Sequence, residues 1–145
     1  MISAGTVNKD KKLDLQVICD HSTPRTTSHQ RIDHVAFENG STTFNGRIHI
    51  LEHASGCNAQ LKNRSLAMGR ETTINAKPEL EIYNDDVQCS HGSTIGQVDE
   101  TQLFYMRSRG IKERDAHAIL CEGFLRETIS GPLSASATSN LIPER

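Results

Sequence analysis

A cysteine and a histidine separated by one residue form the most promising chemical pair in the chain. Cys89 and His91 lie in VQCSHGSTI, a segment typical of a β-strand. Alternate residues of a strand face the same side, which puts these two side chains about 6.6 Å apart along it. A thiolate and an imidazole suit zinc, copper or iron, but a closed tetrahedral site needs four ligands. The other ligands would have to come from a partner or from sulfide.

The same two residues also have ordinary structural interpretations. Cys89 fits a small buried hydrophobic residue, and His91 fits a capping or turn residue before Gly92. The residues alone leave both alternatives open.

Two other groups of titratable residues are weaker candidates. Asp85 and Asp86 resemble a carboxylate pair for acid–base chemistry, but adjacent acids are also common turn formers, and we favour the turn. His49 and His53 would lie about 13 Å apart in a strand, so we do not expect them to share a metal ion.

Short strands separated by polar turns are expected from about Leu13 to Gln97. In the segment from Thr42 to Ile50, for example, Phe44, Ile48 and Ile50 supply an apolar side. Glycine would allow the tight turns nearby, at Asn39-Gly40, Asn45-Gly46, Ser55-Gly56 and Met68-Gly69. This pattern fits a sandwich, a barrel or a β-solenoid, and no strict repeat length decides among them.

Two helices are expected after Val98. Asp99 and Gln102 have the spacing of a helix N-cap with its reciprocating residue, and Gly110 is a plausible stop. A second helix should bury one apolar face, made by Ala116, Ile119, Leu120, Gly123 and Phe124. The tail from Ser130 has no amphipathic period and is expected to be flexible.

Composition restricts the class of protein. The 145 residues suit one domain, and a net charge of -2 gives no reason to expect nucleic acid or an anionic membrane as a partner. No segment predicts a membrane span or a signal peptide, so a cytoplasmic location is expected. The four cysteines are far apart, which makes a disulfide framework unexpected.

The run KPELEIYNDDVQCSHGSTIGQVDETQLFYMRSRGI, Lys77 to Ile111, resembles the signature block of the SufB/SufD family of the SUF iron–sulfur cluster assembly system. It is closer to the SufD branch than to the SufB branch. The resemblance extends less densely through FNGRIHI and LKNRSLAMGR, and covers about Leu13 to Phe124.

The resemblance implies a mainly β fold, a right-handed parallel β-helix over 1–98, followed by a small helical segment over 99–129. The tail over 130–145 departs from the family pattern, and its composition predicts that it is flexible. The resemblance also implies a non-catalytic scaffold that pairs with a SufB-like subunit through the β-helix and docks a SufC-like ATPase through its C-terminal helices. A homodimer is a further possibility, and neither nucleic acid nor membrane is an expected partner.

In this family the histidine that matches His91 lies at the SufB interface and takes part in forming the nascent cluster. The iron–sulfur cluster would be transient and shared with the partner, not held stably by this chain alone, and Cys89 is the weaker ligand. The expected partner-binding residues are Leu103, Phe104, Tyr105, Arg107, Arg109, Ile119 and Phe124.

Two alternatives to a scaffold remain. Some carbohydrate-active enzymes are parallel β-helices. In this chain, the only candidate catalytic residues for such an enzyme would be Glu81, Asp85 and Asp86. The chain could also be a truncated fragment that self-associates through an exposed strand and has no assembly activity.

Overall fold

Seven β-strands precede two α-helices in the computed structural model, which describes residues 1–69 and 71–129. The strands and helices are β1 (Ile2–Val7), β2 (Lys12–His21), β3 (Thr27–Phe37), β4 (Ser41–Ile50), β5 (Cys57–Met68), β6 (Thr73–Ile82), β7 (Val87–Gln97), α1 (Glu100–Ser108) and α2 (Glu113–Arg126). The tail expected to be flexible lies outside the described residues.

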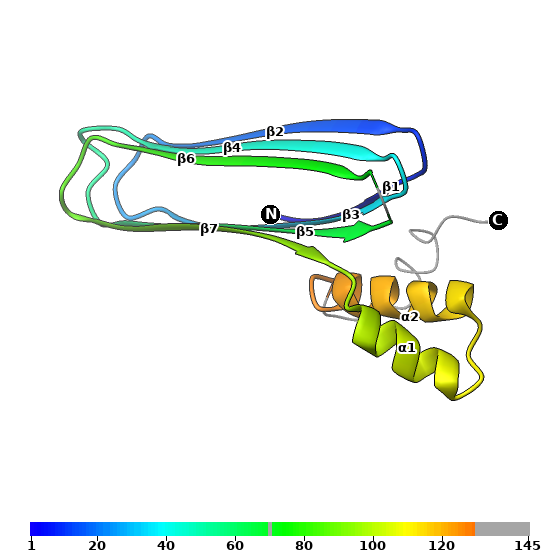
Figure 1. Cartoon of the computed structure of the whole chain (residues 1–145). Helices are drawn as coiled ribbons and strands as arrows, with labels where there is room; N and C mark the ends of the chain where they lie inside the picture. Colours follow the sequence, from blue (N-terminus) through cyan, green and yellow to red (C-terminus); the bar gives the residue numbers. More distant parts are fainter. Residues whose placement is uncertain (70, 130–145) are drawn as a thin grey trace.

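Consecutive strands alternate between two parallel sheets. Sheet A has the order β1-β3-β5-β7 and sheet B the order β2-β4-β6, so that each strand from β2 to β6 is the crossover between two strands of the other sheet. Figure 1 shows the result, a flattened coil of about three turns with the helices at one end. This confirms the expected β-helix followed by helices, and it excludes the sandwich and the barrel.

The register between neighbouring strands explains why no repeat is visible in the sequence. The offset is 29 residues from Ile2 to its neighbour Arg31, but 32 residues from Ser41 to Thr73. A period that varies in this way leaves no fixed spacing for a sequence comparison to detect. The first strand, β1, was not predicted, because its Ser-Ala-Gly stretch has a weak strand preference.

Apolar side chains from both sheets fill the interior of the coil, including Phe44, Ile48 and Ile50 as expected. Gly46 was expected in a turn, and that prediction is wrong because it lies in the middle of β4. A Cβ atom there would lie 2.5 Å from the Phe44 ring and 2.8 Å from a Leu61 methyl group. Gly46 is therefore required by packing in the core.

The first helix begins and ends where the sequence indicates. The Asp99 side chain accepts a hydrogen bond from the Thr101 backbone N–H at 2.8 Å, and Gly110 adopts a φ of 85° after the helix. No helix within the described residues is long and apolar enough to span a membrane.

The second helix exists as predicted, but its apolar face was only partly correct. Ala116 is buried, whereas Ile119 is half exposed and Gly123 is exposed. Cys121 and Leu125 are buried instead, because they pack against Val35 and Met68 on the outer face of sheet A. The position of the sheet, which the helix sequence does not contain, decides which face is covered.

Candidate functional site

The last strand of the coil is an unusually open edge. β7 pairs with β5 on one side, and no other strand of the described chain pairs with its opposite side. Its eleven residues, VQCSHGSTIGQ, include neither a proline nor a charged residue. Uncharged edges of this length readily accept another strand, and proteins usually protect them.

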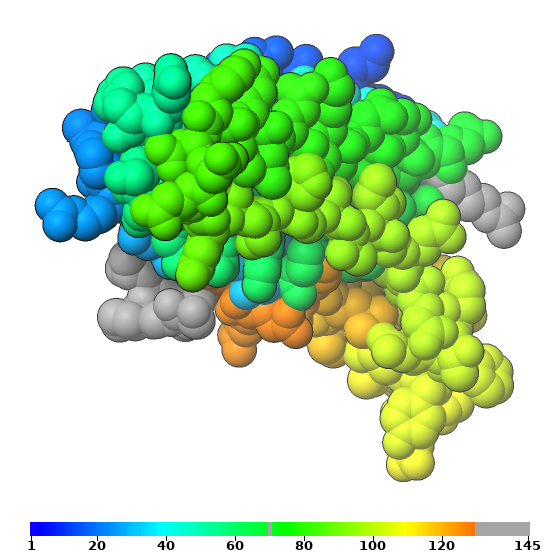
Figure 2. Space-filling model, turned by 90° about the vertical axis from the view of Figure 1, so that its left-hand side faces the viewer, coloured from blue at the N-terminus to red at the C-terminus, as the bar shows by residue number. Residues whose placement is uncertain are grey.

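The neighbouring edge of sheet B is protected by contrast. β6 carries Pro78, which lacks a backbone N–H, together with Lys77, Glu79 and Glu81. In Figure 2 the green to yellow-green residues of β6 and β7 form one broad surface, and the yellow helical residues project below it. Within that surface, β7 is the strand whose backbone edge carries neither a proline nor a charged residue.

His91 lies near the middle of this open edge. It is in register with Leu61, whose side chain points into the core, so His91 shares that face of sheet A. It is nevertheless exposed, and neither of its ring nitrogens has a hydrogen-bond partner among the described residues. The imidazole is therefore free to bind a group brought from outside.

Cys89 lies two residues before His91 on the same face and is half-buried against the core. Burial raises the pKa of the Cys89 thiol; a hydrogen bond from the Ala59 backbone opposes this effect, and nearby Cys57 adds to it. Cys89 is therefore mainly a protonated thiol at neutral pH, and metals bind the thiolate.

The described residues hold no group of three or more His, Cys, Asp or Glu side chains that could bind a metal ion. Cys89 and His91 are therefore at most half of a site. The four cysteines, Cys19, Cys57, Cys89 and Cys121, are free.

Two of the three acidic residues considered for a carbohydrate-active enzyme, Asp86 and Glu81, have structural contacts. Asn84 donates to the carbonyl of Glu52 at 2.6 Å and accepts from the Asp86 backbone at 2.9 Å, which places Asp86 in a turn, as predicted. Glu81 pairs with Arg47 at 3.3 Å on the outer face of sheet B. Glu81 therefore has an arginine partner, and Asp86 belongs to a turn.

The two histidines that could have formed a metal pair have separate partners. Nδ1 of His49 lies 3.3 Å from a carboxylate oxygen of Asp20, and Nε2 of His53 lies 2.9 Å from the carbonyl oxygen of Ser22. Each histidine therefore has a partner of its own.

An exposed aromatic surface lies on the helical segment. Phe104 is 73% exposed, and next to it Tyr105 packs under the guanidinium group of Arg109 at 5.1 Å. Arg107 pairs with Glu113 at 3.3 Å. Phe104, Tyr105, Arg107, Arg109 and Ile119 are accessible to a partner, whereas Leu103 is buried and Phe124 is half-buried beside Arg64.

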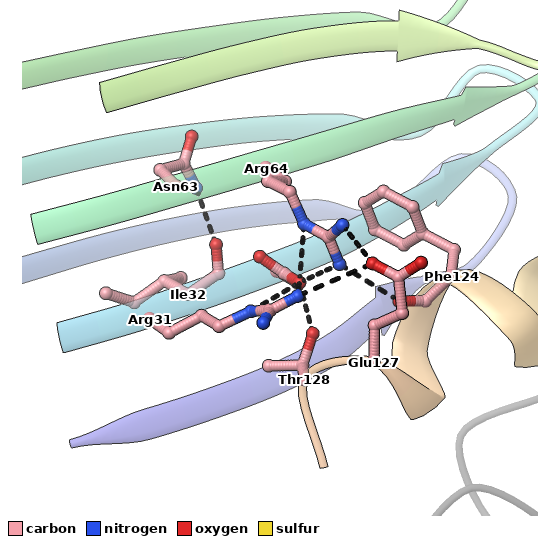
Figure 3. Close-up of polar contacts among 8 residues, drawn as sticks. Arg31, Ile32, Asn63, Arg64, Phe124, Glu127 and Thr128 are labelled. Carbon is pink, nitrogen blue, oxygen red and sulfur yellow. Dashed lines mark hydrogen bonds and ion pairs between the residues drawn. The ribbon is translucent and has the colours of Figure 1, made fainter. Parts of the chain in front are cut away.

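Sequence reasoning missed a polar cluster between sheet A and the end of α2, in which Asp33 and Thr128 are buried. Figure 3 labels Arg31, Arg64 and Thr128 around a carboxylate that it leaves unlabelled. This carboxylate is that of Asp33, which binds all three residues. One signal was available: Asp33 interrupts the apolar segment IDHVAF, and Arg64 follows it 31 residues later, one turn of the coil away.

The family model for the SufBD core domain of the SUF system for FeS cluster assembly matches residues 1–124. The chain belongs to the SufBD family. It is 38% identical over 119 residues to the iron-sulfur cluster assembly protein SufD of Escherichia coli (strain K12), covering 82% of this chain and 28% of that protein.

Other members of the family show similar matches. The chain is 39% identical over 125 residues to the chloroplastic protein ABCI7 of Arabidopsis thaliana, covering 83% of this chain and 26% of that protein. It is 29% identical over 124 residues to the iron-sulfur cluster assembly protein SufB of Bacillus subtilis (strain 168), covering 86% and 27%. The chain thus spans about a quarter of the length of these relatives.

Proposed function

We propose that the chain is a SufD-type, non-catalytic scaffold for iron–sulfur cluster assembly that pairs with a SufB-like subunit through β7. The observation that carries this proposal is an exposed histidine, His91, in the middle of an uncharged and unpaired edge strand. The greater identity to SufD than to SufB supports the SufD type.

Strand addition supplies a physical basis for the pairing. The free N–H and C=O groups of β7 would bond to a strand of the partner, and alternate side chains would supply specificity. His91 would then lie in the joint, where a partner thiolate could complete the ligand set. The cluster would be a transient cargo shared by the two subunits, with Cys89 as a secondary ligand.

The helical segment would dock a SufC-like ATPase. Its exposed aromatic and basic residues resemble the composition of interface hot spots, where Tyr and Arg are enriched. The residues proposed for this contact are Phe104, Tyr105, Arg107, Arg109 and Ile119. In this proposal 1–98 acts as the pairing unit, 99–129 acts as the docking unit, and the complex works in the cytoplasm.

Co-expression with a SufB-like subunit and a SufC-like ATPase tests this proposal. The chain is expected to co-purify with both and to elute with them as one complex in size-exclusion chromatography. Elution alone as a dimer would favour the homodimer, and elution alone as a monomer would favour a fragment without assembly activity. Either result contradicts the scaffold.

A further inference from the structure

A buried asparagine connects three strands of sheet A in one line. Asn63 on β5 is 1% exposed and lies in register with Ile32 on β3 and with Ser93 on β7. Its Nδ2 atom donates a hydrogen bond to the main-chain oxygen of Ile32 at 3.1 Å (Figure 3). Its Oδ1 atom accepts a hydrogen bond from the Ser93 hydroxyl at 3.2 Å. Both ends of the side-chain amide are therefore occupied, and one of them reaches the open edge strand.

The middle of β7 has few other contacts that fix its alignment. His91, Ser93 and Ile95 occupy the face that is buried in β5, but all three are exposed. A Cβ atom added at Gly92 would meet nothing within 4 Å. Strands that contain glycine and have no buried face are weakly held in register. Burial therefore does not determine the register of β7 between His91 and Ile95.

The two ends of β7 are better anchored. Val87 and Cys89 pack against the core at its start, and Val98, just after its end, packs against the cluster that contains Met68. The hydrogen bond from Ser93 to Asn63 lies between these anchors, two residues from the imidazole. It therefore acts on the part of the strand that the apolar contacts do not hold.

The register of β7 decides where His91 lies. A shift of one residue would turn the imidazole to the outer face of sheet A, and a shift of two would move it about 6.6 Å along β5. A shift of two residues in one direction would also put Ile95 opposite Asn63 in place of Ser93. Isoleucine cannot donate, so the buried Asn63 oxygen would lose its partner. A buried polar group that is satisfied in only one arrangement selects that arrangement.

We propose that Asn63 is a positioning residue for His91, which it holds in place by bonding to Ser93 and so fixing the register of β7 on β5. The inference rests on the proposed function, because it concerns how accurately His91 is presented to a partner. The bond between Asn63 and Ser93 lies within this chain, so its effect on the strand can be measured without a partner.

Two native cysteines can detect the shifted strand. Cys57 is in register with Val87, and Cys89 with Ala59, so their Cα atoms lie about 8 Å apart, beyond the ~7 Å that a disulfide spans. The shift that puts Ile95 opposite Asn63 also puts Cys89 opposite Cys57. Added diamide would then accept two electrons and two protons from the two thiols as the S–S bond forms. Mass spectrometry of peptides measures the rate at which this bond appears.

Ser93→Ala in the isolated full chain is the first test. We expect it to form the Cys57–Cys89 disulfide about fivefold faster than wild type, as loss of one hydrogen bond implies. Amide exchange in β7 should accelerate by a similar factor while exchange in β3 and β4 stays unchanged. Ser93→Thr keeps the hydroxyl and should restore the wild-type rates. Ser90→Ala, the same substitution on the outer face of β7, is the matched control.

Equal rates in wild type and Ser93→Ala would overturn the proposal, as would the same acceleration in Ser90→Ala. In a complex with a SufB-like subunit and a SufC-like ATPase, Ser93→Ala should co-purify normally but retain less iron and sulfide than Ser93→Thr. Equal iron and sulfide in these two variants would contradict the positioning of His91. If the wild-type chain binds no partner, the proposed function fails, whereas the disulfide rates of the isolated chain still decide whether Asn63 fixes the register.

Discussion

His91 on β7 lies in register with Leu61 on β5, yet Leu61 is fully buried and His91 is exposed. The two residues occupy the same face of sheet A, one coil apart. The difference arises because Leu61 is covered by the next coil, whereas no strand of the described chain covers His91. A row of positions that is buried in β5 is therefore exposed in β7.

Pairing through β7 should be sensitive to charge on that strand. Ser90→Lys with Thr94→Lys places two exposed lysines on the edge, and lysine is a common device against strand pairing. We expect co-purification with a SufB-like subunit to be lost while the thermal unfolding temperature is unchanged. Asn75→Lys on the β6 edge is the control and should co-purify normally. Normal binding of the β7 variant would show that the partner uses another surface.

Gly46 should be intolerant of any side chain. Gly46→Ala inserts a methyl group against Phe44 and Leu61, and overpacking of this kind costs about 1–3 kcal/mol in the free energy of unfolding. Gly92→Ala is the matched control, because an added Cβ there meets nothing within 4 Å. Urea unfolding of both variants measures the difference, and equal stabilities would contradict the packing described for the core.

The thiol of Cys89 should react slowly with iodoacetamide at neutral pH. Its raised pKa means that less thiolate is present at any given pH than in a free cysteine, so the alkylation rate should rise at higher pH than usual. Burial raises the pKa of Cys121 to about 11, and that thiol should remain the less reactive of the two at pH 9. Mass spectrometry of tryptic peptides separates the sites. A Cys89 profile matching that of a free thiol would contradict its assigned environment.

Docking of the ATPase should depend on Phe104. Phe104→Asp replaces an exposed aromatic group by a charge, so it should weaken co-purification with a SufC-like ATPase and leave binding of the SufB-like subunit intact. Gln102→Ala, at another exposed position of the same helix, should do neither. Retention of the ATPase by Phe104→Asp would place the docking surface elsewhere.

Much of the fold could be predicted from local patterns. Alternating residues such as Phe44, Ile48 and Ile50 define β4, and the Asp99 cap with Gly110 delimits α1. The coil itself could not be derived locally, because each strand pairs with one a full turn away at a varying offset. The β-helix was predicted instead from the segment Lys77 to Ile111, which resembles the signature block of the SufB/SufD family.

The parts that were missed depend on distant contacts. Gly46 has the sequence of a turn residue, and only the position of Leu61 shows why glycine is needed there. Asp33 and Thr128 are 95 residues apart, so no local pattern connects them. The exposure of His91 likewise depends on whether another strand covers β7. The sequence around His91 does not contain that information.

The most direct test of the half-site is the cluster content of the complex with His91→Ala. The chain, a SufB-like subunit and a SufC-like ATPase would be co-expressed and purified anaerobically, and iron and acid-labile sulfide measured per complex. Ser90→Ala, at the adjacent exposed position on the opposite face of β7, is the control. The account predicts that His91→Ala assembles normally but loses most of its iron and sulfide, while Ser90→Ala keeps both. Equal iron and sulfide in wild type and His91→Ala would contradict it.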